Sequence, residues 1–347
     1  METSAFDFDL PDGLIAQHPV EPRDASRLFV VRRAGGPFEH KTFADLPELL
    51  APGDVLVRND TRVVPARLEG LRAATGGRWE GLFLRELPGG DWEVLATTRG
   101  KPAAGEVVSV EAPGGSALRL TLVAKGDAGR WVVRPEVSAS ASDLLDRFGR
   151  VPLPPYIRKG REGPGDRLTY QTVYAREPGS VAAPTAGLHF TDAVFRRLAG
   201  RGVALADVTL HVGVGTFRPI EAERIDDHVM HAERGEVSAE TASLLNARRA
   251  AGGRIVAVGT TSARLLETAA GASGVIRAFS GETAIYLRPG CAFRGVDALL
   301  TNFHLPRSSL VVLVGAFAGV DLVRAAYAEA VRLRYRFYSY GDAMLVV

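Results

Sequence analysis

The 347-residue sequence has little sulfur and no long apolar run, since it holds one cysteine, Cys291, and three methionines. A single cysteine excludes an internal disulfide and favours a reducing compartment. The N-terminus carries Glu2, Asp7 and Asp9 where a signal peptide has basic residues followed by an apolar stretch. The longest apolar run, residues 310–320, is too short to cross a bilayer. We therefore expect a cytoplasmic protein.

A strong charge of either sign is also missing. The net charge is +2, and 46% apolar with 24% charged residues is ordinary for a globular protein. The charge is unevenly spread, at −4 over residues 1–65, +1 over residues 66–150 and +5 over residues 151–347. This distribution permits a polyanion partner through a local basic face, but it does not by itself indicate one.

Two kinds of pattern divide the chain. In residues 1–65 and 151–347, buried strand-like runs alternate with helical patterns, which predicts an α/β core domain with sites at strand ends. In residues 66–150, turn signals recur between short strands, which predicts an inserted small antiparallel β-barrel domain, with a sandwich as the alternative. If this insertion binds nucleic acid, its exposed groups for stacking on bases would be Trp79, Trp92 and Arg99. Tryptophan in such strands is more often part of the core.

Periodicity and turn residues give the expected elements. In the core domain we predict strands at 27–32, 54–58, 203–212, 254–258, 280–283 continuing at 286–289, and 298–300. We predict helices at 43–50, from the N-cap Thr191 to Gly200, and at 237–251, 263–269, 310–320 and 321–335. In the inserted domain we predict strands at 78–84, 92–96, 106–110, 118–123 and 130–133, and a closing helix at 143–148.

The strand at 203–212 carries the densest set of unusual polar residues. Its even positions are all apolar, whereas its odd positions include Asp207, Thr209 and His211, which therefore share one face. A glycine-rich turn follows, and His189 lies in the loop before the preceding helix. Any one of these residues could be an ion-pair partner or a core histidine. A carboxylate, a hydroxyl and an imidazole together at a strand end favour a functional site.

Other strand ends also carry polar groups. The strand at 54–58 leads into Asn59, Asp60, Thr61 and Arg62, where Arg62 could bind a phosphate or carboxylate or simply pair with Asp60. The proline-rich stretch at 152–158 displays Tyr156 and Arg158, which either hold a base and a phosphate or belong to a solvated linker.

The segment Gly259, Thr260, Thr261 and Ser262 stands between a buried strand and a helix. Free N–H groups and the helix dipole favour the binding of an anion at such a helix start. Helix capping alone would explain the polar residues of the segment equally well. The segment lacks the lysine of a P-loop, so a nucleoside triphosphate is not expected.

A metal site is the alternative for His228, His231 and Glu233, with His189 and His211 as further ligands. No cysteine is close in sequence and the H-E-x-x-H pattern is absent, so we expect no metal. Substrate contact or acid–base chemistry is the preferred hypothesis for His228 and His231.

Nine segments together resemble one family, the S-adenosylmethionine:tRNA ribosyltransferase-isomerases of queuosine biosynthesis. In order they are NDTRVVPARL (59–68), PLPPYIR (152–158), YQTVYA (170–175), AAPTAGLHFT (182–191), VTLHVGVGTF (208–217), MHAE (230–233), VGTTSARLLE (258–267), DALLTNFHLPRSSL (297–310) and YRFYSYGDAM (335–344). The resemblance runs from near residue 6 to residue 344. The inserted domain matches only loosely, because Gly77, Arg78, Trp79 and Glu80 stand where a Lys-Ile-Glu type run is expected.

The resemblance implies a reaction. The ribosyl part of S-adenosylmethionine is transferred to the aminomethyl group of 7-aminomethyl-7-deazaguanine at the tRNA wobble position. It is isomerised to an epoxycyclopentanediol, giving epoxyqueuosine-tRNA, and adenine and methionine leave. S-adenosylmethionine is thus consumed as ribosyl donor, and no permanently bound cofactor is implied.

The same resemblance supplies the candidate residues. The catalytic candidates are Asp207, His211, His189, His231 and Glu233. As a hypothesis, Asp207 or His211 removes a proton from the ribose 5′ carbon, and His189 or His231 protonates adenine. The substrate-binding candidates are Asn59, Thr61, Arg62, Tyr156, Arg158, Tyr170, Thr185, Thr209, Thr216, His228, Gly259, Thr260, Thr261, Ser262, Asn302, His304, Tyr338 and Asp342.

The expected partners are the tRNA anticodon loop and S-adenosylmethionine, with no membrane. The oligomeric state is open, and a monomer is the simplest expectation. Two other classes of function are kept as alternatives, a metal-dependent hydrolase and a tRNA-binding protein without catalysis. Strand ends rich in histidine and carboxylate argue against the second, because phosphate binding alone would use lysine and arginine.

Overall fold

The computed structural model describes residues 1–112, 115–213 and 219–347, which form two compact units. The core unit comprises Met1–Arg62, Pro154–Lys159 and Leu168–Val347. The barrel unit comprises Val63–Leu153 and Gly160–Arg167, so the chain returns to it briefly after first leaving it. An α/β core with an inserted antiparallel barrel confirms the predicted fold class.

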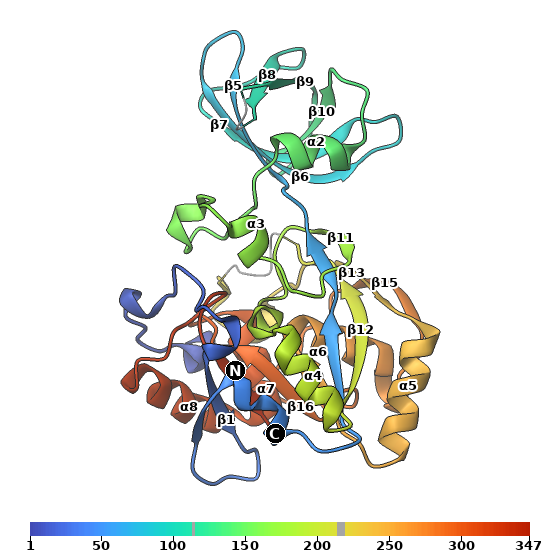
Figure 1. Ribbon diagram of the computed structural model, residues 1–347. Helices are drawn as coiled ribbons and strands as arrows, with labels where there is room; N and C mark the ends of the chain where they lie inside the picture. Colours follow the sequence, from blue (N-terminus) through green and yellow to red (C-terminus); the bar gives the residue numbers. More distant parts are fainter. Residues whose placement is uncertain (113–114, 214–218) are drawn as a thin grey trace. The chain divides into compact units, whose positions relative to one another are not determined.

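The barrel unit is a closed six-stranded barrel in the order β10-β7-β6-β5-β8-β9, with every neighbouring pair antiparallel (Figure 1). Closure leaves no free sheet edge, which removes a site for unwanted strand pairing. Its elements are β5 (Arg67–Arg72), β6 (Arg78–Glu86), β7 (Trp92–Thr98), β8 (Val107–Glu111), β9 (Ala117–Lys125), β10 (Arg130–Pro135) and α2 (Ala141–Phe148).

Tryptophans fill the interior of the barrel. Trp79 and Trp92 are each 1% exposed and Trp131 is 5% exposed, within a cluster of apolar residues from all six strands. Gly81 is required beside Trp79, because a Cβ atom there would lie 2.2 Å from the indole ring. The hypothesis that Trp79 and Trp92 stack on bases is therefore wrong, since their strand positions point inward.

The core unit is built on a nine-stranded mixed sheet in the order β15-β13-β12-β3-β14-β16-β17-β1-β2. A separate two-stranded sheet joins β11 to β4. The strands are β1 (Arg27–Val31), β2 (Glu39–Thr42), β3 (Val55–Asn59), β4 (Thr61–Val63), β11 (Glu177–Ser180), β12 (Ala204–Leu210), β13 (Glu233–Val237), β14 (Ile255–Val258), β15 (Phe279–Thr283), β16 (Ala298–Asn302) and β17 (Ala343–Val346).

The middle of this sheet is parallel. β12, β3, β14 and β16 run in one direction, so their carboxyl ends meet at one edge. The chain first places β12 on one side of β3 and then β14 on the other. Such a reversal of strand order opens a crevice beyond the carboxyl ends, where open α/β sheets bind ligands.

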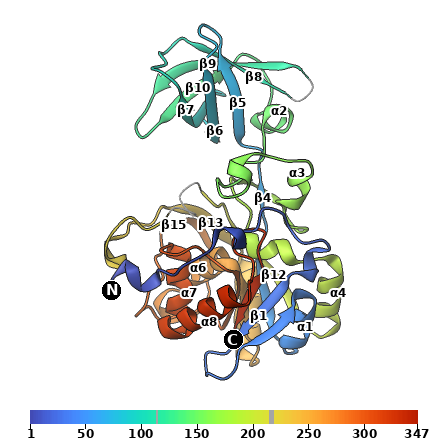
Figure 2. The same ribbon diagram turned by 90° about the vertical axis from the view of Figure 1, so that its left-hand side faces the viewer.

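Helices cover both faces of the sheet. The elements are α1 (Leu46–Leu49), α3 (Asp166–Thr169), α4 (Asp192–Gly200), α5 (Ala239–Ala250), α6 (Gly259–Ala270), α7 (Ser309–Ala318) and α8 (Val320–Arg332). Short 3₁₀ helices are η1 (Thr3–Phe6), η2 (Asp12–Leu14), η3 (Arg23–Ala25), η4 (Phe43–Asp45), η5 (Arg158–Gly160), η6 (Thr185–His189), η7 (Ile225–Asp227) and η8 (Gly271–Ser273). One apolar cluster packs α1 and α4 against the sheet, and another packs α5, α6, α7 and α8 against its opposite face (Figure 2).

The predicted N-cap Thr191 is confirmed, whereas several predicted bounds are wrong. Thr191 accepts the Val194 N–H in α4, and Ser238 accepts the Thr241 N–H in α5. Helix α6 begins at Gly259 rather than at 263, so the Gly-Thr-Thr-Ser segment is its buried first turn. No strand forms at 286–289, because β15 ends where its last residue pairs with the first residue of β13. The helix expected at 321–335 ends at residue 332.

No single helix among the described residues is long and apolar enough to cross a membrane. The pair α7 and α8, bent by 117°, would qualify on length and composition alone, but most of α7 is buried in the core of the unit.

Candidate active site

Three polar side chains lie along one face of β12 and of the residue that follows it, and each is bonded to the last residues of β3 or to the segment after it. Asp207 accepts two hydrogen bonds from Arg58, from Nε to Oδ1 and from Nη2 to Oδ2, both at 2.8 Å. The Thr209 hydroxyl donates to Oδ1 of Asp60 at 2.7 Å. His211 Nδ1 lies 2.8 Å from Oγ1 of Thr61. This match follows from the parallel register, which aligns Asp207 with Arg58.

Arg58 and Asp60 are site residues that the sequence analysis did not select. The Arg58 guanidinium also lies over the rings of Tyr174 at 4.5 Å and Phe195 at 4.7 Å, so it is fixed on several sides. Asp60 is 1% exposed, and burial raises the pKa of its carboxyl despite Arg176, whose Nη2 lies 2.7 Å from Oδ2. The sequence signal was their position, since both flank Asn59 at a strand end.

The His211 ring is held neutral. Burial, followed by the positive charge of Arg234, lowers its pKa, while Asp60 and Glu177 oppose this shift. The Thr61 hydroxyl lies 3.5 Å from the Glu177 carbonyl; when it donates there, its oxygen accepts the Nδ1–H of His211. Nε2 then carries the lone pair. His211 is thus a neutral imidazole with one nitrogen able to accept a proton.

Asn59 ties the strand ends together. Its Oδ1 accepts the N–H groups of Leu210 at 3.0 Å and Thr61 at 3.2 Å. Its Nδ2 donates to the Leu210 carbonyl at 2.9 Å and to Oγ1 of Thr261 at 3.3 Å. These bonds of the buried Asn59 fix the end of β3 relative to the end of β12 and the first turn of α6.

Two small cavities, of about 10 and 20 Å³, lie at the carboxyl edge of the parallel strands. They share Thr185, Asn302, His304 and Leu310. Gly259, Thr260 and Thr261 line the larger one, and Tyr338 lines the smaller one. Seven predicted substrate-binding residues therefore meet here, from η6, α6, β16, the loop that follows β16 and the C-terminal segment. Ser262, in the same helical turn, is instead buried, and its hydroxyl donates to the Val258 carbonyl.

Two histidines near these cavities are buried and neutral. Burial lowers the pKa of His189 to about 3 and that of His304 to about 3. Both ring nitrogens of His189 have partners, Ser26 Oγ at 2.7 Å and Asn302 Nδ2 at 3.1 Å, and its ring stacks on Phe43. Nε2 of His304 lies 2.8 Å from Oγ1 of Thr301. These contacts favour structural roles.

Several other candidates lie apart from this group. Glu233 forms a buried ion pair with Nη1 of Arg264 and accepts the Gly213 N–H at 3.0 Å. His231 is exposed and His228 is half-buried beside Tyr286. Asp342 accepts from Arg27 and from the Arg336 N–H, so it braces the C-terminal segment.

The candidates for tRNA contact show mixed exposure. Arg62 is exposed, and Asp60, which was one of its two possible partners, contacts Arg176. Tyr156 is hydrogen-bonded to Ser339 at 2.8 Å, and Arg158 donates from Nη1 to the Gln17 carbonyl at 2.6 Å. Tyr170 is buried edge-on to Tyr340. Thr216 lies outside the described residues.

The metal hypothesis gains no support from the described part of the chain, which holds no group of three or more His, Cys, Asp or Glu side chains placed to bind an ion. Glu233, one of its proposed ligands, faces Arg264 instead.

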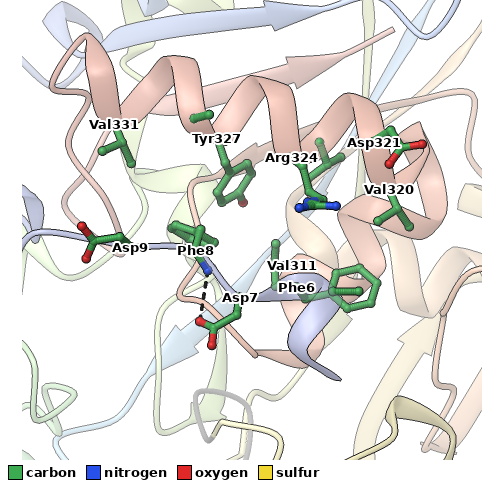
Figure 3. A pocket seen from close by; sticks show the side chains of 13 residues that line it. Phe6, Asp7, Phe8, Asp9, Val311, Val320, Asp321, Arg324, Tyr327 and Val331 are labelled. Carbon is green, nitrogen blue, oxygen red and sulfur yellow. Dashed lines mark hydrogen bonds between the residues drawn. The ribbon is translucent and has the colours of Figure 1, made fainter. Parts of the chain in front are cut away.

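A larger cavity, of about 580 Å³, lies between the N-terminal segment and α8 (Figure 3). Its lining is mainly apolar, with Asp7, Asp9, Asp321 and Arg324 among its thirteen residues, and it includes none of the predicted site residues. Its size and apolar lining are typical of ligand sites, although a more open and more polar cavity of about 700 Å³ lies in the barrel unit. The imidazole and carboxylate candidates gather instead at the strand ends, so we keep the strand ends as the candidate active site.

The fold and the strand-end residues together define an enzyme of the α/β class that carries an inserted barrel. A family model described as queuosine biosynthesis protein matches residues 3–346. The S-adenosylmethionine:tRNA ribosyltransferase-isomerases of Symbiobacterium thermophilum and Moorella thermoacetica are 54% and 51% identical to this chain, each over 100% of both chains. A crystal structure of S-adenosylmethionine tRNA ribosyltransferase from Thermotoga maritima is similar, with 37% identity and a TM-score of 0.56 over 99% of this chain and 100% of that chain.

The chain belongs to the queuosine biosynthesis family of S-adenosylmethionine:tRNA ribosyltransferase-isomerases. The resemblance that the nine segments indicated is thereby confirmed, and so is the assignment to an enzyme class.

Proposed function

We propose that this chain transfers the ribosyl group of S-adenosylmethionine to 7-aminomethyl-7-deazaguanine at the wobble position of a tRNA and isomerises it, with loss of adenine and methionine. The observation that carries the proposal is full-length identity of 54% and 51% to enzymes of this name. S-adenosylmethionine is a consumed substrate. Because it and tRNA are cytoplasmic, we place the enzyme in the cytoplasm.

His211 is the base that we assign to the first step. The sulfonium of S-adenosylmethionine acidifies the adjacent 5′ carbon, and a neutral imidazole with a free lone pair can accept the proton. Asp207 is less suited, since both of its carboxylate oxygens are bonded to Arg58. We assign Asp207 the role of a fixed negative charge beside the reacting centre.

The first turn of α6 is our candidate for the methionine carboxylate. This 12-residue helix begins with no side-chain cap at Val258, so its first N–H groups and its dipole face the carboxyl edge. Gly259, Thr260 and Thr261 also line the larger of the two small cavities there. Arg62, Tyr156 and Arg158 are proposed to contact the anticodon loop.

Adenine release tests the reaction directly. We expect the purified protein to release adenine from S-adenosylmethionine in the presence of tRNA carrying 7-aminomethyl-7-deazaguanine, measured by chromatography. The matched control is the same tRNA with guanine at the wobble position, which lacks the accepting amine and should give no adenine. Tight tRNA binding without release from the modified substrate would contradict the transferase function and support a binding protein.

Gly179 offers a test of the His211 position. A Cβ atom on Gly179 would lie 2.9 Å from Cε1 and Nδ1 of the His211 ring, and its φ of +145° disfavours other residues. We expect Gly179→Ala to displace the ring and lower kcat by about tenfold to hundredfold. Gly13→Ala is the control, because a Cβ atom there meets nothing within 4 Å. Equal kcat in the two variants would show that the ring position is not critical.

A further inference from the structure

Two buried polar atoms of residues that line the smaller cavity have no hydrogen-bond partner among the described residues. They are Oδ1 of Asn302 and the hydroxyl of Tyr338. Asn302 is 1% exposed and Tyr338 is 5% exposed, and both residues line the cavity of about 10 Å³. Buried polar groups left unpaired are costly, so two of them in the lining of one cavity call for an explanation.

The orientation of the Asn302 amide is fixed by its neighbours. The backbone carbonyl of Tyr338 can only accept, so the atom 3.1 Å from it must be Nδ2. The second N–H of the same amide points to Nε2 of His189 at 3.1 Å. With both donors used, Oδ1 is left as an acceptor.

His189 completes this arrangement. Because Nε2 accepts from Asn302, the proton of the neutral ring sits on Nδ1, which donates to Oγ of Ser26 at 2.7 Å. Burial lowers the pKa of His189 to about 3, so the ring keeps this form throughout the physiological range. His189 is therefore a positioning residue that holds the Asn302 amide in one orientation.

Tyr338 supplies the complementary donor. Its φ of +74° lies in the left-handed region, and its carbonyl is tied to Asn302 and to the Gly341 N–H. Such a backbone is held only where its surroundings enforce it, which is common at ligand sites. Burial raises the pKa of the Tyr338 hydroxyl, so the group remains protonated and able to donate.

A hydroxyl group carries both the donor that Oδ1 of Asn302 lacks and the acceptor that the Tyr338 O–H lacks. It donates to Oδ1 of Asn302 and accepts from the Tyr338 O–H, and a cavity of about 10 Å³ has room for about one group of that size. Leu305 and Leu310 close part of the wall with apolar surface. An ammonium group, which only donates, or a carboxylate, which only accepts, would leave one of the two partners unsatisfied.

We propose that the cavity between Asn302 and Tyr338 binds one ribose hydroxyl of S-adenosylmethionine, with His189 orienting the amide that accepts from it. This inference rests on the proposed function, which supplies the ribose. Holding a sugar hydroxyl fixes the ring while it is rebuilt, and it rejects donors that lack the hydroxyl. The proposed methionine and ribose sites are neighbours, because the two small cavities share four lining residues.

The test measures binding of S-adenosylmethionine and of its 2′-deoxy and 3′-deoxy analogues by titration calorimetry. The protein is saturated with tRNA that has guanine at the wobble position, so that no turnover occurs. In the wild type we expect one of the analogues to bind about tenfold to hundredfold more weakly than S-adenosylmethionine, because it leaves two buried groups unpaired.

The Tyr338→Phe variant tests whether this cavity causes the weaker binding of the deoxy analogue. In that variant the penalty for the same analogue should shrink to below about threefold, while the other analogue behaves as with wild type. Tyr335→Phe is the control, because it removes another tyrosine hydroxyl, bonded to His40, and should keep the full penalty.

Two outcomes overturn the inference. Either both analogues bind the wild type as tightly as S-adenosylmethionine does, or the penalty is the same in Tyr338→Phe, which would leave a water molecule as the occupant. A wild-type complex that binds no S-adenosylmethionine at all would instead contradict the proposed function, so the two failures are distinguishable.

Discussion

Replacing His211 by glutamine is expected to lower kcat for adenine release by about 10²–10⁴-fold, the usual contribution of a general base. Glutamine retains a polar group that can bond to Thr61, but it cannot accept a proton at neutral pH. Single-turnover rates with saturating modified tRNA and S-adenosylmethionine measure this loss without interference from product release.

The pH dependence of the wild type follows from the same histidine. Because burial and Arg234 lower the pKa of His211, the neutral form that acts as base persists below the ordinary value of about 6.5. The rate should therefore stay constant as the pH falls from neutrality through about 6.5 and decline only at more acid pH. In His211→Gln this acid decline should disappear.

His40→Gln is the matched control for this prediction. His40 is exposed, and its ring is bonded to Tyr335 in the part of the core unit that carries β1 and β2. We expect its kcat and pH profile to equal those of the wild type. Near-full turnover by His211→Gln would remove His211 from the mechanism and return the role of base to Asp207.

The face of β12 that carries the candidates was predictable, because side chains two apart in a strand point the same way. Their partners were not. Asp207 meets Arg58 and His211 meets Thr61 only because two strands about 150 positions apart pair in one particular parallel register. Sequence pattern shows which face a residue occupies, but not which distant side chain lies opposite.

The fold class was predictable for a related reason. Local turn residues and alternation reveal the barrel strands except β5, and buried runs reveal six of the nine strands of the large core sheet but not β2, β13 or β17. These patterns do not show which polar side chains tertiary packing buries. His189 and Glu233 have suitable chemistry for catalysis, yet the fold encloses the first among Ser26, Asn302 and Phe43. Glu233 is paired with Arg264 in the fold.

Glu233→Gln is expected to lower the free energy of unfolding by about 3–5 kcal/mol, because it leaves the Arg264 guanidinium buried without its counter-charge. The side chains of Glu233 and Arg264 are each 3% exposed, so water cannot compensate for the loss. Glutamine still offers an oxygen to the Gly213 N–H, so the change is mainly in charge. Urea unfolding followed by circular dichroism measures the difference.

The double variant Glu233→Gln with Arg264→Met separates a structural pair from a catalytic carboxylate. Removing both charges should recover most of the lost stability, since a buried ion pair replaced by uncharged side chains is often nearly neutral. The control Glu329→Gln breaks the exposed pair with Arg332, and it should leave unfolding almost unchanged because solvent already screens that pair. If Glu233→Gln unfolds like the wild type but loses adenine release, and the double variant does not regain it, then Glu233 acts on substrate and its contact with Arg264 is incidental. Stability that falls and then returns with the second substitution would instead assign the pair to the architecture that holds β13 against α6.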